Sequence, residues 1–270
     1  MRRPAVAGHF YPAYEAELRE SLRNCFLGPF GPGRLPVHGA GGDMVAALSP
    51  HAGIMASGMG AAHVYDAISR NGLAEVYVII GPKHHHRGWE VSLCDQPFST
   101  PLGICALDEE VLGKMSQRYE VNNRAHAREH SIEMQVIFLQ YIHPAAKIVP
   151  ILMGDQSEES AADLAEGIRE ACGGRRAMVI ASGDMSHYVP KQQAMRDDRA
   201  LIDRMLELDV PGMYEVLRER RISACGYGPT AAAIMATHPG RAQLLKQMDS
   251  GDVFDSEEVV GYASVAFYKE

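Results

Sequence analysis

Runs of consecutive apolar residues alternate along the chain with segments in which apolar residues recur every three or four positions. The apolar runs predict strands at about 44–49, 75–80, 147–152 and 177–182. The helical periodicity predicts helices at about 12–26, 56–70, 108–118, 131–142, 158–172, 191–207 and 211–220. This alternation is typical of βαβ units. It predicts an α/β fold with a central, mostly parallel or mixed sheet covered by helices on both faces.

The last part of the sequence has a different pattern. Two apolar segments at 242–248 and 259–267 predict a terminal strand pair, joined by the turn-rich residues 249–252. A stretch rich in glycine and proline at 28–42 predicts a surface loop. The pattern shows no linker, internal repeat or low-complexity tract, so we expect one domain over residues 1–270.

Composition narrows the class of protein. With 270 residues, of which 46% are hydrophobic and 22% charged, the chain has enough apolar material for a large core. The net charge of -8 argues against non-specific nucleic-acid binding, which needs a basic surface. The start lacks the apolar region of a signal peptide, and no window approaches the ~20 apolar residues of a membrane span. The five cysteines are an odd number without C-x-x-C spacing, which indicates reduced thiols and a cytoplasmic protein.

Side chains of types that can bind metals follow three of the predicted strands. His51 comes after 44–49, the triplet 84–86 after 75–80, and Asp184 after 177–182. Because the carboxyl ends of parallel strands meet at one edge of a sheet, we expect these side chains to converge there. A histidine in a loop can also be purely structural. The sequence leaves open which of the three histidines His84, His85 and His86 faces the pocket.

Two further segments add reactive side chains. His187 lies three residues after Asp184, a spacing that suits a general acid or base whose pKa is raised by a carboxylate. Cys225 is surrounded by small residues, and the two glycines that follow it indicate the start of a further helix, where a thiol can become a nucleophile or a metal ligand. The alternative for Cys225 is a small buried apolar side chain.

One motif predicts a different chemistry. The sequence from His126 to His130 fits H-x-x-E-H, in which two histidines of one helix bind zinc and a glutamate, here Glu129, acts as the base. The same region can be interpreted as the start of a helix, with Ser131 near the cap and the carboxylate of Glu133 in the first turn.

Several of these motifs together resemble the Memo family, which is related in fold to the class III extradiol ring-cleaving dioxygenases. The matching segments, in the order of the family and spread over nearly the whole chain, are Ala7–Pro12, Ser49–Gly53, Gly81–His85, Glu129–Gln135, Ser182–His187 and Cys225–Gly226. The resemblance implies a metal pocket lined by His51, His84 and Cys225. His187 would act there as a proton donor or acceptor, with Asp184 orienting it.

The ligand set expected from this resemblance departs from that of the extradiol enzymes. Those enzymes hold ferrous iron with two histidines and a carboxylate, whereas Cys225 stands in the third position here. The resemblance implies Fe(II), and because a thiolate is a softer ligand than a carboxylate, copper and zinc are alternatives. Microbial family members are associated with a radical-SAM protein, which makes such a protein an expected partner beside an unidentified small-molecule substrate.

The sequence therefore supports three functional hypotheses. The first is a mononuclear metal-dependent, dioxygenase-like redox enzyme that uses His51, His84 and Cys225. The second is a non-catalytic binding module that uses the same pocket for a peptide or protein partner. The third is a zinc hydrolase that acts through His126, Glu129 and His130.

Overall fold

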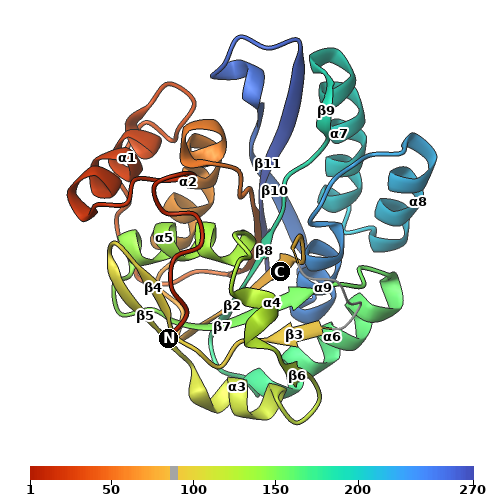
Figure 1. Ribbon diagram of the computed structural model, residues 1–270. Helices are drawn as coiled ribbons and strands as arrows, with labels where there is room; N and C mark the ends of the chain where they lie inside the picture. Colours follow the sequence, from red (N-terminus) through yellow and green to blue (C-terminus); the bar gives the residue numbers. More distant parts are fainter. Residues whose placement is uncertain (86–90) are drawn as a thin grey trace.

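Parallel strands form the centre of a mixed sheet in the computed structural model, which describes residues 1–85 and 91–270 (Figure 1). The order of the main path is β10-β11-β1-β8-β2-β7-β3-β6, and the four strands β1, β8, β2 and β7 run parallel to one another. The strands are β1 Met44–Ser49, β2 Val76–Pro82, β3 Val91–Leu93, β4 Phe98–Thr100, β5 Gly103–Leu107, β6 Glu120–Val121, β7 Lys147–Met153, β8 Ala177–Ser182, β9 His187–Pro190, β10 Arg241–Asp249 and β11 Glu258–Tyr268.

The central strands are buried on both faces. In β2, Val78 and Ile80 belong to one hydrophobic cluster, whereas Tyr77 and Ile79 belong to the cluster on the other face. Successive side chains of a strand point to opposite faces, so a strand that is apolar at every position needs a covering layer on each side. This double burial explains why β1, β2, β7 and β8 appear in the sequence as continuous apolar runs.

Two layers of helices provide that cover (Figure 1). One layer contains α1 Glu15–Leu27, α2 Ile54–Arg70 and α5 Ser131–Ile142. The other contains α3 Glu109–Met115, α6 Glu158–Cys172, α7 Lys191–Leu206, α8 Val210–Arg220 and α9 Tyr227–Thr237. A single turn of helix, α4 Asn123–His126, precedes α5, and a short 3₁₀ helix, η1 Ser250–Asp252, joins β10 to β11. The predicted α/β fold with helices on both faces is confirmed.

The predicted elements agree with the structure where the sequence pattern is long. The four predicted strands correspond to β1, β2, β7 and β8, and the terminal pair forms the antiparallel strands β10 and β11. The strands β3, β4, β5, β6 and β9 were not predicted. Each has two to five residues, which is too short for a clear alternation of apolar and polar positions.

The first residues of the chain are fastened to α5 by a buried ion pair. The guanidinium of Arg2 contacts the carboxylate of Glu133 and donates hydrogen bonds to the backbone oxygens of His126 and Glu129. The hydroxyl of Tyr11 also donates to Glu133, and both charged side chains are almost fully buried. Each of these buried charges is stabilised by the other, since neither is solvated by water.

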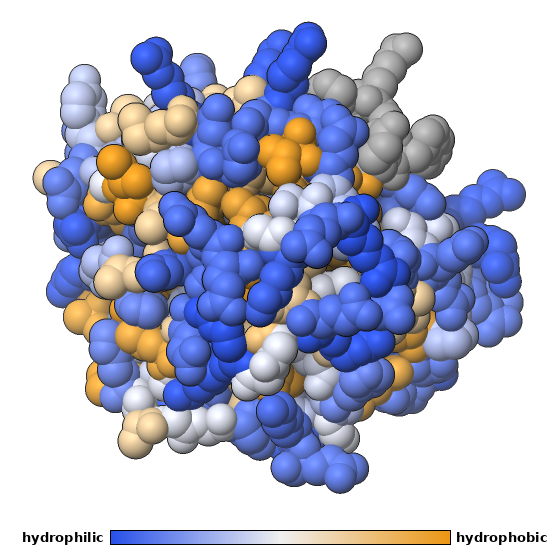
Figure 2. All heavy atoms as spheres, turned by 90° about the horizontal axis from the view of Figure 1, so that it is seen from below, coloured by the Kyte–Doolittle hydropathy of each residue, from blue (hydrophilic) through white to orange (hydrophobic). Residues whose placement is uncertain are grey.

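The surface is mixed in polarity. On the face shown in Figure 2, hydrophilic side chains predominate and hydrophobic ones lie in small groups between them. None of the helices within residues 1–85 and 91–270 combines the length and the apolar character needed to cross a bilayer.

Candidate metal site

His51 lies between the end of β1 and the start of α2. Its side chain is only 2% exposed, and its Nδ1 is 2.9 Å from Oγ of Ser182, the last residue of β8. Burial, together with the neighbouring His130 and His84, holds the pKa of His51 well below its usual range. The imidazole is therefore neutral at physiological pH, which is the state that binds a metal.

The hydrogen bonds around Ser182 determine which nitrogen of His51 carries the proton. Ser182 Oγ lies 2.7 Å from the carbonyl oxygen of Ser131, which can only accept, so the hydroxyl proton points there. Toward His51 Nδ1 and toward Nε2 of Gln135, at 2.8 Å, the same oxygen must then act as acceptor. His51 therefore carries its proton on Nδ1 and presents the lone pair of Nε2 to the pocket.

Loss of the Ser182 hydroxyl is expected to weaken metal binding without unfolding the protein. In Ser182→Ala the orientation and tautomer of His51 are no longer fixed, so we expect the affinity for a divalent metal to fall about 10- to 100-fold, the usual cost of losing an outer-shell partner. The measurement is a competition titration with a chelating indicator.

Ser49 supplies the matched control for this experiment. It is buried at the end of the neighbouring strand β1, and its hydroxyl has no hydrogen-bond partner in the described part of the chain. Ser49→Ala should leave metal affinity unchanged. Equal affinities in the two variants would show that Ser182 does not orient His51.

His84 follows β2 and is held by Glu129. The carboxylate of Glu129 accepts hydrogen bonds from the His84 backbone N–H at 2.6 Å and from His84 Nδ1 at 2.9 Å. The Nδ1 proton is thereby fixed and Nε2 is left as the ligand atom, the same arrangement as in His51. Burial alone would raise the pKa of Glu129. The hydrogen bond and charge of His84, with the backbone N–H groups of Ser131 and His84, lower it well below its usual range.

Cys225 is brought to the site by the close contact of two glycines. An added Cβ on Gly183 would lie 2.5 Å from Cα of Gly226, so neither position has room for a side chain. The contact places the Cys225 sulfur 3.2 Å from the backbone nitrogen of Asp184 and 3.3 Å from Nε2 of His51. Burial, reinforced by the charge of Asp184, raises the pKa of the free thiol. A bound cation reverses this balance, since a coordinating thiol is deprotonated.

The three residues that the family resemblance implied as metal ligands therefore meet in space. Potential ligand atoms of His51, His84 and Cys225 lie within 4.8 Å of one another. Two imidazole lone pairs and one sulfur form a donor set that suits Fe(II), Cu(I) or Zn(II). A second group within the same limit is His84, Glu129 and His130, but the Glu129 carboxylate is already engaged by four N–H groups.

Asp184 and His187 are near the site, but not in the predicted relation. The Asp184 carboxylate accepts the backbone N–H of His51 at 2.8 Å, and burial raises the pKa of Asp184 to about 6. His187 Nδ1 instead lies 2.8 Å from the carbonyl oxygen of Ser223, which fixes its proton on that nitrogen. The expectation that Asp184 orients His187 is thus corrected, because the backbone oxygen of Ser223 occupies the position that the carboxylate was expected to take.

His187 lies in an irregular stretch of backbone. The next residue, Tyr188, has a φ of 55°, an uncommon conformation for a residue other than glycine. The pairing of β9 with β11 is also irregular, with a register shift between Val259 and Val260. Irregularities of this kind redirect side chains at the ends of strands. A regular strand pattern could not have predicted the direction of His187.

His130 lies against the candidate ligands, although the sequence predicted a metal-binding role for it only in the H-x-x-E-H motif. Its ring stacks on His84 with centroids 4.8 Å apart and meets His51 edge-on at 5.3 Å. Phe10 covers it at 5.0 Å. Burial lowers the pKa of His130 to about 4 in spite of the nearby Glu129, so this imidazole is neutral at physiological pH. The signal available in the sequence was its position next to Glu129 at a helix start.

The H-x-x-E-H motif does not form the helix that a zinc hydrolase of this type requires. The helix α4 ends at His126, and α5 begins only at Ser131, with His130 as its N-cap residue. Nε2 of His126 lies 2.9 Å from the backbone oxygen of Ser92, in a buried position away from the other histidines. The third hypothesis is therefore contradicted in its geometry, because the two histidines do not share one helix face.

The remaining members of the histidine triplet differ in position. His85 is exposed at the rim, with its ring centroid 5.9 Å from that of His130. His86, which the sequence left open as a ligand, lies outside the described residues. Among the described members, His84 is the one whose ligand atom approaches His51 and Cys225.

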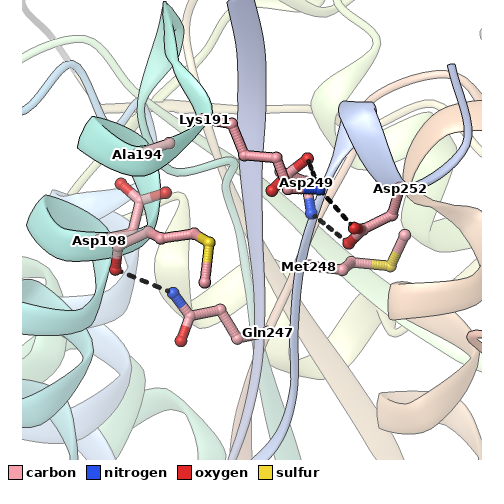
Figure 3. Close-up of a pocket in the computed structure, with 8 residues that line it drawn as sticks. Lys191, Ala194, Asp198, Gln247, Met248, Asp249 and Asp252 are labelled. Atoms are coloured by element: carbon pink, nitrogen blue, oxygen red, sulfur yellow. Dashed lines mark hydrogen bonds and ion pairs between the residues drawn. The ribbon is translucent and has the colours of Figure 1, made fainter. Parts of the chain in front are cut away.

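A separate pocket lies between α7 and the terminal strands (Figure 3). Its lining is Lys191, Ala194, Met195, Asp198, Gln247, Met248, Asp249 and Asp252. Lys191 Nζ bridges the carboxylates of Asp249 at 3.2 Å and Asp252 at 2.7 Å, which fastens β10 to α7. The cavity holds about 180 Å³, below the roughly 300–1,000 Å³ of typical ligand sites, and contains none of the candidate ligands. We therefore assign it a structural role.

Asp198 in this pocket supports the loop that carries His187. It accepts hydrogen bonds from the backbone N–H of Ser186 at 3.0 Å and from its hydroxyl at 2.5 Å. Burial raises the pKa of Asp198 from 3.8 to about 6, although those hydrogen bonds oppose the shift. The folded protein therefore binds a proton more tightly than the unfolded chain.

This shift predicts a pH-dependent stability. The charged form of Asp198 costs about 3 kcal/mol above pH 6, and the cost disappears as the pH falls below about 4. In Asp198→Asn the unfolding free energy, relative to the wild type, should therefore rise by about 2 kcal/mol between pH 4 and pH 7.5. Urea unfolding at both pH values measures this difference. Asp203→Asn, which removes a surface carboxylate on the same helix, is the control. If the stability of Asp198→Asn relative to the wild type changed as little between the two pH values as that of Asp203→Asn, the prediction would be contradicted.

Comparison with known proteins gives one consistent family. The family model described as "Memo-like protein" matches residues 2–266. Similar proteins are a MEMO1 family protein of Methanopyrus kandleri, 40% identical with 98% of each chain covered, and one of Methanothermobacter thermautotrophicus, 42% identical with 98% of this chain and 100% of the relative covered. A MEMO1 family protein of Archaeoglobus fulgidus is 40% identical, with 99% of each chain covered.

Proposed function

The chain belongs to the Memo-like protein family, and from this premise we propose that it is a mononuclear metalloprotein with redox activity on a small-molecule substrate. His51, His84 and Cys225 would hold the metal. Fe(II) is the metal we propose first, with copper or zinc as alternatives, because a thiolate beside two imidazoles suits each of them.

The observation that carries this proposal is the orientation of the two imidazoles. His51 and His84 both have Nδ1 engaged, by Ser182 and by Glu129, so that Nε2 of each is left as the ligand atom, and Nε2 of His51 faces the Cys225 sulfur. Outer hydrogen bonds of this kind are typical of histidines that bind metals. Three protein ligands are also the usual number in catalytic metal sites, where further positions stay open for substrate. The His84 side chain is 28% exposed, which leaves a route from solvent.

The surrounding residues could serve proton transfer. A redox-active metal at this site would supply electron transfer and Lewis acidity. Nε2 of His187 is free to accept a proton, since Nδ1 is bound to the backbone of Ser223. His130 is neutral and stacks on His84, so it packs against this ligand without adding a positive charge to the site. Phe10 covers one side of His130 and limits the access of water there.

The test is elemental analysis of untagged protein purified without oxygen, followed by oxygen-uptake measurements with a panel of catechols. Near-stoichiometric iron or copper with oxygen uptake would support the proposal. A bound metal without turnover, together with a measurable peptide or protein partner, would favour the binding-module alternative. His126→Ala is the control, because His126 is bonded to Ser92 and lies outside the ligand group. Protein that contains no metal, or metal that is lost in His126→Ala, would contradict the proposed metal site.

A cytoplasmic location fits this proposal. All five cysteines are free thiols, and four of them are buried. A thiolate ligand needs a reduced sulfur, which the cytoplasm maintains.

A further inference from the structure

We propose that Gln156 is a positioning residue that fixes the Cys225 sulfur for metal binding, an inference that rests on the proposed role of Cys225 as a ligand. Gln156 lies in the short connection between the end of β7 and Ser157, the N-cap of α6. It is far from Cys225 in sequence and belongs to none of the motifs noted above. Its side-chain amide nevertheless contacts both ends of the turn that carries Cys225.

The amide of Gln156 bridges this turn with two hydrogen bonds. Its Nε2 donates to the backbone oxygen of Cys225 at 2.8 Å, and its Oε1 accepts from the backbone N–H of Gly228 at 2.9 Å. Gly228 stands in the first turn of α9, where backbone N–H groups have no partner within the helix. A single side chain therefore satisfies one acceptor and one donor of the turn.

These bonds matter because the other side of Cys225 is fixed as well. The backbone N–H of Cys225 donates to the backbone oxygen of Asp184 at 3.1 Å. With its N–H held by Asp184 and its carbonyl held by Gln156, both peptide planes next to the Cα of Cys225 are defined. The direction of the Cα–Cβ bond follows from those planes. Only the side-chain rotation remains to place the sulfur opposite His51.

Gln156 is itself held in place. The hydroxyl of Tyr214, on α8, donates to the backbone oxygen of Gln156 at 2.9 Å, and the Tyr214 ring meets Tyr227 edge-on with centroids 5.7 Å apart. An added Cβ on Gly228 would lie 2.6 Å from Cβ of Gln156, so the two segments pack without spare room. Gln156 therefore connects the end of β7 with α8 and α9 through specific contacts.

The chemistry of the amide suggests a discriminating variant. In Gln156→Met the side chain keeps nearly the same length and volume but can neither donate to Cys225 nor accept from Gly228. This variant should therefore lose the positioning of Cys225 as fully as Gln156→Ala does. A role in packing alone would leave it close to the wild type.

Two measurements test the proposal in the full-length protein. The first is Co(II) titration followed by the sulfur-to-cobalt charge-transfer band. In Gln156→Ala the affinity should fall about 10- to 100-fold, and Gln156→Met should show the same loss although its side chain fills nearly the same space. The second is the rate at which iodoacetamide alkylates Cys225 in metal-free protein, read by peptide mass spectrometry. Gln156→Ala should react several-fold faster because the turn is no longer held.

The control is Gln140→Ala. Gln140 accepts a hydrogen bond from Thr100 at 2.5 Å in the helix layer on the other face of the sheet, so this variant also loses a buried amide. An alkylation rate in Gln156→Ala no higher than in this control would overturn the proposal, whether or not cobalt binds. Unchanged cobalt affinity in Gln156→Ala would overturn it too. A wild-type protein that shows no charge-transfer band would contradict the proposed function of Cys225, while the alkylation rates would still decide the role of Gln156.

Discussion

Replacing Cys225 with serine is expected to abolish stable metal binding while the fold persists. The loss should exceed the about 10- to 100-fold that removal of an outer-shell partner costs, because a ligand atom is itself removed. A hydroxyl is a harder and much less acidic donor than a thiol, so it does not replace the sulfur toward Fe(II) or Cu(I). Cys225 lies outside both hydrophobic clusters of the core, so the core packing is little affected.

Metal content and circular dichroism, measured on the same samples, test this expectation. His51→Ala and His84→Ala should lose the metal as well, since their Nε2 atoms complete the donor set. Cys172→Ala serves as the control, because Cys172 is a buried thiol at the end of α6, outside the ligand group. Metal content that is unchanged in Cys225→Ser would remove Cys225 from the ligand set.

Replacing Arg2 with alanine is expected to cause the largest loss of stability. Arg2 and Glu133 form a buried pair whose side chains are 2% and 0% exposed. Removal of one partner leaves an uncompensated charge in the interior, which typically costs about 3–5 kcal/mol. Arg2 also holds the backbone oxygens of His126 and Glu129, so its loss should loosen the loop that orients His84.

Guanidinium unfolding of Arg2→Ala measures this cost. Arg3→Ala is the control, because Arg3 is exposed, and its change should stay within about 0.5 kcal/mol. The double variant Arg2→Met with Glu133→Gln should recover part of the loss, since it leaves no unpaired charge. An Arg2→Ala protein as stable as Arg3→Ala would show that the ion pair contributes nothing to folding.

Much of the fold was predictable because its signals are local. The strands β1, β2, β7 and β8 are apolar at nearly every position, since each is buried on both faces. The positions of His51, His84 and Asp184 were predictable for a related reason. Each follows a strand directly, and parallel strands bring their carboxyl ends to one edge of the sheet.

The directions of the site side chains were not predictable, because they depend on contacts between distant segments. The tautomer of His51 depends on Ser182, 131 residues away, and its contact with Cys225 joins residues 174 apart. His187 is held by Ser223 rather than by the nearby Asp184, and the next residue, Tyr188, has a positive φ. No local pattern records such a choice.

The sequence by itself thus determined the α/β fold, the burial of the central strands on both faces and the placement of histidine and aspartate side chains near one edge, and the family resemblance added Cys225. Only the tertiary structure decided that His84 faces His51 and Cys225, that His130 joins them and that His126 does not. The physical reason is that periodic burial depends on the pattern of neighbouring residues in the sequence. A hydrogen-bonding partner instead depends on which group the packed elements bring within about 3 Å.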